Sequence, residues 1–234
     1  MPLLYLLYFA VRAQAVGHTT EAFRNANQVI RLERWLGIFK ELEFQNATSL
    51  SHDVLLHFLN IVWFYGHWPV IIVCGVWLLI KHPQIYTLTR NAFLASGAIA
   101  LLVYALFPVV PRHFIEDGVV YTLTVPYVMN SEQSALVNPF APIPSMHVGW
   151  NLVIALGLFM TFRNRLRYLL VLLPILTWVS TVATGSHYII DGVAGIGVAS
   201  VGFLVAVWLN RTWPQMVKRL PAWVPGFRQR TSAT

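Results

Sequence analysis

Long apolar stretches separated by short polar segments dominate the chain up to about residue 209. Six stretches stand out, at residues 3–16, 54–80, 91–107, 148–162, 168–182 and 189–209. A helix needs about 20 apolar residues to cross the hydrocarbon of a bilayer. The middle stretches are somewhat shorter, so we expect their ends to include flanking polar residues. The pattern predicts an all-α fold, a polytopic membrane bundle of about six transmembrane helices.

The segment between the first two stretches has a different pattern. Over residues 21–44, apolar side chains recur at steps of three and four, which marks one face of a helix. These positions are Ala22, Ala26, Val29, Leu32, Leu36, Phe39 and Leu42. Such an amphipathic helix lies at the outer membrane surface or packs on the outer ends of the spans, and the sequence leaves both open.

Composition supports a membrane protein of one domain. Hydrophobic residues make up 57% of the chain and charged residues 11%, whereas soluble domains carry about a quarter charged residues. We divide the chain into an N-terminal part (1–53), a catalytic bundle (54–209) and a basic tail (210–234). The first stretch ends in the small-x-small pattern of a signal cleavage site, so a cleaved signal, a short span and a clipped start all remain open.

The formal net charge of +7 is unevenly distributed. Ten basic residues follow the second, fourth and sixth stretches: Lys81, Arg90, Arg163, Arg165, Arg167, Arg211, Lys218, Arg219, Arg228 and Arg230. The loop at 108–145 has only Arg112. The positive-inside rule then predicts a cytoplasmic C-terminus, with this loop and the 183–186 turn on the extracytoplasmic side, in a plasma-membrane protein. The distribution argues against nucleic acid as a partner.

Two segments on the predicted outer side carry histidine. The first is Ser145-Met146-His147, preceded by prolines and followed by the fourth stretch. Ser145 is a good helix N-cap, and the free N–H groups of a helix N-terminus suit a phosphate. His147 there can donate a proton to a leaving oxygen. The alternative is a histidine that only hydrogen-bonds at the membrane interface.

The second segment precedes the sixth stretch and combines His187 with Asp191, four positions later. On a helix this spacing places both side chains on one face. A carboxylate that binds one imidazole nitrogen leaves the other free as a nucleophile. An acidic side chain in a span also needs a partner, so a structural pair that joins two helices is the alternative.

The sequences PSMH at 144–147 and HYIID at 187–191 resemble the second and third motifs of the type 2 phosphatidic acid phosphatase (PAP2) superfamily. The resemblance covers roughly residues 54–209 and is closest to the inositolphosphotransferase branch of sphingolipid synthesis. It implies a six-helix, metal-independent enzyme without a cofactor. In that reaction His187 attacks phosphorus, Asp191 supports it and His147 protonates the leaving group. Water or an alcohol then accepts the phosphoryl group from a phosphohistidine.

The sequence departs from the family at its phosphate-binding cations. The lysine of the first motif is replaced by Ala105, and the arginine ahead of the third-motif histidine is replaced by Thr181. Arg112 is the best remaining candidate for phosphate binding, with His113 a weaker one, beside Ser145 and Met146 at the helix N-terminus.

Further polar residues are candidates for substrate contact. His57, Asn60 and His67 fall on one face of the second stretch. Contact of Asn60 and His67 with a lipid headgroup and plain hydrogen bonding between helices are equally compatible with this pattern. Glu116 and Asp117 are either acceptor-alcohol ligands or a solvated acidic turn, and we favour the turn.

The pattern favours a lipid phosphatase or phosphotransferase with a lipid phosphate as substrate and, for transfer, an alcohol acceptor. A metal-dependent membrane hydrolase is an alternative, although few acidic residues are available as ligands. A non-catalytic transporter or scaffold is another. The sequence does not identify the lipid, the acceptor or the oligomeric state.

Overall fold

A computed structural model describes residues 19–51, 53–120, 122 and 142–219, and these residues form helices joined by short turns, without a strand. In chain order the elements are α2 (Thr19–Trp35), α3 (Glu41–Ser51), α4 (Asp53–Tyr65), α5 (Trp68–Lys81), α6 (Pro83–Leu106), η1 (Arg112–Phe114), α7 (Met146–Thr161), η2 (Arg165–Val171), α8 (Leu172–Ala183) and α9 (Ile189–Arg219). The predicted all-α membrane fold is confirmed. The stretch at 3–16 lies outside the described residues.

Three described helical segments are long and apolar enough to cross a membrane: Pro83–Leu106, Arg165–Ala183 and Ile189–Thr212. A bent pair, Val54–Tyr65 with Trp68–Lys81, makes a fourth if it is one span. α7 is a shorter apolar helix. The predicted number of about six spans is therefore not confirmed. Many large apolar side chains of these helices, such as Ile72, Leu102 and Leu204, are exposed on the protein surface, as lipid contact requires.

The second apolar stretch is bent by 47° between α4 and α5. Pro69 stands in the first turn of α5 and has no N–H to continue the ladder from α4. A kink at a proline is the expected result. The bend places His67 between the two helices, in the protein interior.

The single helix predicted over residues 21–44 is wrong, because the chain turns after α2. Gly37 has a positive φ of 71°. The Ile38 N–H donates to Glu33 O at 2.9 Å and the Gly37 N–H to Arg34 O at 3.1 Å. These bonds form a glycine-ended helix terminus of the Schellman type, and α3 then starts at Glu41 in a new direction.

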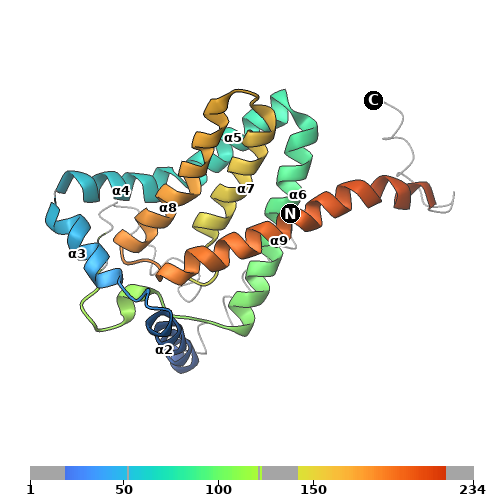
Figure 1. The fold of residues 1–234 in the computed structure, drawn as a ribbon. Helices are drawn as coiled ribbons and strands as arrows, with labels where there is room; N and C mark the ends of the chain where they lie inside the picture. Colours follow the sequence, from blue (N-terminus) through green and yellow to red (C-terminus); the bar gives the residue numbers. More distant parts are fainter. Residues whose placement is uncertain (1–18, 52, 121, 123–141, 220–234) are drawn as a thin grey trace.

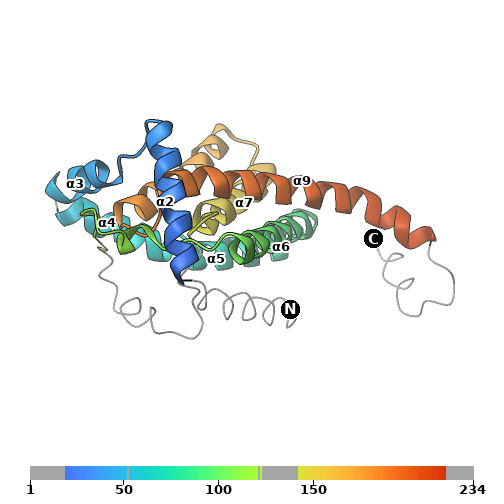
Figure 2. The same cartoon turned by 90° about the horizontal axis from the view of Figure 1, so that it is seen from below.

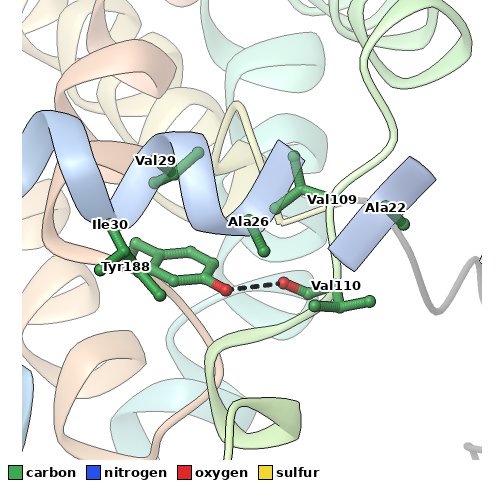
Figure 3. Close-up of a cluster of buried hydrophobic side chains, with 7 residues drawn as sticks. All are labelled: Ala22, Ala26, Val29, Ile30, Val109, Val110 and Tyr188. Carbon is green, nitrogen blue, oxygen red and sulfur yellow. Dashed lines mark hydrogen bonds between the residues drawn. The ribbon is translucent and has the colours of Figure 1, made fainter. Parts of the chain in front are cut away.

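α2 crosses the starts of other helices instead of running alongside them, which Figure 2 shows from below. Its buried face packs on the segment after α6 and on Tyr188, in a cluster drawn in Figure 3. That face consists of Ala22, Ala26, Val29 and Ile30. The Tyr188 hydroxyl donates to Val110 O at 3.1 Å. The sequence left two arrangements open for this segment, at the membrane surface or packed on the ends of the spans. The contacts of α2 correspond to the second.

α6, α7, α8 and α9 form the bundle (Figure 1), with α7 packed against the other three. Small residues bring α7 and α9 close together. A Cβ added at Gly195 lies 2.2 Å from Ser145 O, and one at Gly149 lies 2.8 Å from Gly195 O. Such close backbone approach is typical of packed membrane helices, and it brings the starts of α7 and α9 together.

Candidate active site

The two predicted histidine segments meet at one end of the bundle, where α7 and α9 begin. The Ser145 N–H donates to Asp191 O at 3.0 Å, which joins the two helix starts directly. The ring centroids of His147 and His187 are 5.6 Å apart, with the planes at 71°. Two imidazoles at this separation can both reach the oxygens or phosphorus of one phosphate.

The predicted contact between His187 and Asp191 is present. His187 Nδ1 lies 3.0 Å from Asp191 Oδ2. His187 precedes the first residue of α9, so the contact does not arise from two side chains on one helical face. The carboxylate instead folds back over the helix start and also accepts the Tyr188 N–H at 2.9 Å. Asp191 is buried and His187 is 7% exposed.

The contact through Nδ1 determines what His187 can do. A carboxylate at Nδ1 favours the tautomer with its proton on that nitrogen, so the Nε2 lone pair is available. Within the described part of the chain, Nε2 makes no hydrogen bond. The arrangement can therefore supply a nucleophile whose orientation is fixed by Asp191.

His147 lies in a stack of aromatic rings. His67 is 4.2 Å from it between ring centroids, and Trp63 is 5.0 Å away. His67 in turn stacks on Trp150 at 5.9 Å. The bend between α4 and α5 thus brings His67 against His147. These ring contacts test neither of the two roles predicted for His67, headgroup contact and hydrogen bonding between helices.

The N-terminus of α7 presents unpaired hydrogen-bond donors. Ser145 is the N-cap residue, as predicted, but its hydroxyl makes no capping bond. The Ser145 side chain is fully buried and its Oγ has no hydrogen-bond partner among the described residues. Trp63 Nε1 is also buried without a partner in this part of the chain. Neutral donors beside a helix N-terminus suit an anion.

Other bonds hold the start of α7 in place. The Tyr104 hydroxyl on α6 donates to Pro144 O at 2.7 Å. Asn151 Nδ2 donates to His147 O at 2.9 Å and to Thr177 Oγ1 on α8 at 3.1 Å. These contacts fix His147 from two neighbouring helices.

Arg112, the predicted phosphate ligand, is buried and paired with carboxylates. Its two terminal nitrogens lie 2.7 and 2.8 Å from the two Asp117 oxygens, and its Nε lies 3.9 Å from Glu41 Oε2. Its Cζ is 5.8 Å from the Tyr188 ring centroid. The guanidinium therefore lies close to the site, but its two terminal nitrogens are already paired with Asp117. The sequence favoured a solvated acidic turn at Asp117. The structure instead makes Asp117 an ion-pair partner of Arg112.

The remaining candidates bind the backbone of neighbouring segments. His113 Nδ1 lies 3.1 Å from Gly185 O. Asn60 Nδ2 donates to Thr122 O at 3.2 Å. Both residues therefore border the turn and loop that precede His187. Gly185 has a φ of +72°, and a Cβ there lies 2.5 Å from Val120 O, so the turn requires glycine.

Two functional candidates were missed in the sequence. Glu33 and Glu41 are buried and accept N–H groups at the start of α9. The pattern contained a signal for Glu33, because it continues the buried face of Ala22, Ala26 and Val29 by four residues. An acidic residue on an apolar face requires a buried partner.

Comparison with known proteins supports the assignment of the two histidine motifs to one family. The family model described as the PAP2 superfamily matches residues 27–205, well over half of the chain. The chain belongs to the PAP2 superfamily. Neither curated proteins nor solved structures provide a significant match to it. The superfamily assignment confirms the resemblance at that level, and the inositolphosphotransferase branch is not confirmed.

Membership in the PAP2 superfamily indicates an enzyme that hydrolyses phosphoesters as phosphatases do. Together with the apolar helices, it also identifies a membrane protein. The match begins at residue 27, within α2, so it includes both buried glutamates as well as the histidine motifs.

Proposed function

We propose that the protein is a lipid phosphate phosphatase or phosphotransferase that works through a phosphohistidine on His187. The observation that carries the proposal is the approach of the His147 ring to the His187–Asp191 pair at two joined helix starts. In the first step His187 Nε2 bonds to phosphorus and the bond from phosphorus to the leaving alcohol breaks. His147 gives its proton to the leaving oxygen.

The second step returns the enzyme to its starting state. Water attacks phosphorus, the phosphorus–nitrogen bond breaks and phosphate leaves, while His147 takes the proton from the water. An alcohol in place of water accepts the phosphoryl group, which gives a new phosphate monoester, and makes the same residues a transferase. Incubation of a labelled lipid donor with and without inositol separates the two reactions by their products.

The phosphate oxygens would be held mainly by neutral donors, given the missing cations of the family. The backbone N–H groups of Met146 and His147, the Ser145 hydroxyl and Trp63 Nε1 would supply these donors, which is consistent with their lack of partners among the described residues. Arg112 and His113 complete the proposed phosphate site from the loop side, with Arg112 exchanging Asp117 for phosphate. Asn60 and His67 would contact the substrate headgroup.

A lipid substrate is supported by an apolar groove beside the site. The groove has a volume of about 390 Å³ and lies between α2, the end of α6 and the start of α9. It is lined by Gln28, Val29, Leu32, Phe107, Ile143, Ile190 and Ala194. Hydrocarbon in such a groove is removed from water without loss of hydrogen bonds. Ala194→Phe should therefore raise KM for a long-chain lipid phosphate more than for a short-chain one.

The decisive test of the mechanism is His187→Ala in purified protein. We expect phosphate release from lipid phosphates to disappear, and labelled phosphate to be trapped on wild-type protein but not on the variant. Wild-type turnover by His187→Ala would exclude the mechanism. The described residues contain no group of three or more His, Cys, Asp or Glu side chains placed to hold a metal ion, so activity should persist in a chelator. Loss of activity in the chelator would favour a metal-dependent hydrolase.

A further inference from the structure

Carboxylates from three elements hold the first N–H groups of α9. The Tyr188 N–H donates to Asp191 Oδ2 at 2.9 Å. The Ile189 N–H donates to Glu41 Oε1 at 3.3 Å and the Ile190 N–H to Glu33 Oε1 at 2.8 Å. These N–H groups have no acceptor within their own helix, and their partial positive charge favours a carboxylate. Glu33 and Glu41 come from α2 and α3, far away in the sequence.

The two glutamates are close enough to affect each other's protonation. Both are buried, at 0% and 1% exposure. Burial, followed by the hydrogen bond to Glu41, raises the pKa of Glu33 to about 9. Glu41 Oε2 lies 3.9 Å from Arg112 Nε. A proton on Glu33 avoids two adjacent buried negative charges.

We propose that Glu33 and Glu41 are positioning residues, which fix the start of α9 through its first N–H groups and with it the His187–Asp191 dyad. This inference rests on the proposed function. The backbone before the dyad is fixed from the other side, because the His187 N–H donates to Thr181 O at 3.2 Å. The two glutamates bind the backbone N–H groups of Ile189 and Ile190, between His187 and Asp191, so the direction of His187 depends on both sets of bonds.

The charged and titratable groups around the pair determine its response to pH. Asp191 and Tyr188 face it from the start of α9, and Arg112 faces it from η1. Tyr188 donates its hydroxyl proton to Val110 O and so does not donate to the pair. Loss of the Glu33 proton adds a negative charge beside Glu41 and Asp191, while the Arg112 guanidinium is already paired with Asp117. Repulsion then moves α2 and α3 away from α9, and activity falls.

The test compares Glu33→Ala, Glu41→Ala and Glu33→Gln in the full-length protein, with a lipid phosphate as substrate. Alanine leaves an N–H of α9 unpaired. We expect kcat per folded molecule to fall about tenfold or more, the effect of one unsatisfied buried group, with a smaller change in KM. Glutamine keeps an acceptor for Ile190 and a donor for Glu41. Glu33→Gln should therefore keep near wild-type kcat and stay active at higher pH than the wild type.

The matched control is Glu43→Gln on α3, whose side chain is 71% exposed and pairs with Lys40. It should leave kcat and the pH profile unchanged. A role confined to stability would lower the yield of folded protein. It would change neither kcat per folded molecule nor the pH above which activity is lost, the alkaline limit. The inference would be overturned if the alanine variants lowered only the yield of folded protein and Glu33→Gln left the alkaline limit of activity unshifted.

Three further outcomes complete the test and separate this inference from the proposed function. If Glu33→Ala and Glu41→Ala do not fold, the alkaline limit of Glu33→Gln decides, and an unshifted limit contradicts the pair. If His187→Ala is inactive while all glutamate variants behave as wild type, only the positioning role fails. If His187→Ala is active, the proposed function itself fails.

Discussion

A single carboxylate, Asp191, serves both the structure of α9 and the orientation of His187. Its Oδ2 accepts the Tyr188 N–H and contacts His187 Nδ1. Because both contacts use this one oxygen, an amide that presents its N–H to the imidazole also loses the backbone bond. The ring would then hold its proton on the wrong nitrogen.

Asp191→Asn should therefore lower kcat by roughly 10² to 10⁴, the range expected for the loss of a positioned proton-transfer group. KM should change little, because the phosphate site at the start of α7 is unaffected. Steady-state kinetics on a lipid phosphate measures both. A variant with more than half of the wild-type kcat would show that the pair is only structural.

Glu33 makes stability depend on pH in a direction opposite to that of most carboxylates. Its pKa is raised from the usual 4.5 to about 9 by burial and by Glu41. Between these values the folded protein holds a proton at Glu33 that the unfolded chain has lost. The free energy of unfolding therefore falls as pH rises through this window, by at most about 1.4 kcal/mol per pH unit for one proton.

Thermal unfolding of the detergent-solubilised protein at pH 6 and pH 9 measures this effect. The wild type should lose more stability on this change than Glu33→Gln, whose side chain has no proton to release. An equal loss in both proteins would show that Glu33 does not titrate in this range.

At the scale of elements, the distance between α7 and α9 decides whether the histidines can act together. A Cβ at Gly195 would lie 2.2 Å from Ser145 O, whereas one at Gly197, on the same helix, would meet nothing within 4 Å. Gly195→Ala forces the two helix starts apart, and overpacking of this kind costs about 1–3 kcal/mol.

We expect Gly195→Ala to lower both the melting temperature and kcat, since His147 and His187 would separate. Gly197→Ala is the matched control and should be neutral or slightly stabilising, because alanine favours helix over glycine. If the two substitutions changed activity equally, close backbone contact between α7 and α9 would not be what brings His147 and His187 together.

The elements show which parts of the structure the sequence could predict. Apolar runs and two short motifs were enough for the helices and for the His187–Asp191 contact, because both depend on local spacing. The break at Gly37 was missed because a period of three and four was continued through a residue that ends the helix. The glutamate pair depends on contacts across about 150 positions, which local spacing does not contain. The same holds for the stack of His67 on His147, which depends on the bend at Pro69.

At the scale of the whole molecule, the segments predicted to share the extracytoplasmic side lie together. Gln45 Nε2 on α3 donates to Ala183 O at 3.0 Å and to Val120 O at 2.7 Å. At the opposite end, Trp77 of α5 stacks on Phe162 after α7, with centroids 5.6 Å apart, next to the basic residues at 163–167. Charge and fold therefore agree on which ends belong together, while the membrane face of each end stays a prediction.

Single cysteines at the two ends test that prediction in a Cys74→Ser background. Glu43→Cys lies at the active-site end and Asn164→Cys at the basic end, and both positions are exposed. Because basic loops stay in the cytoplasm, a membrane-impermeant maleimide should label Glu43→Cys in intact cells. Asn164→Cys should react only after permeabilisation. The reverse pattern would place His187 on the cytoplasmic side, and its substrate would then come from the inner leaflet.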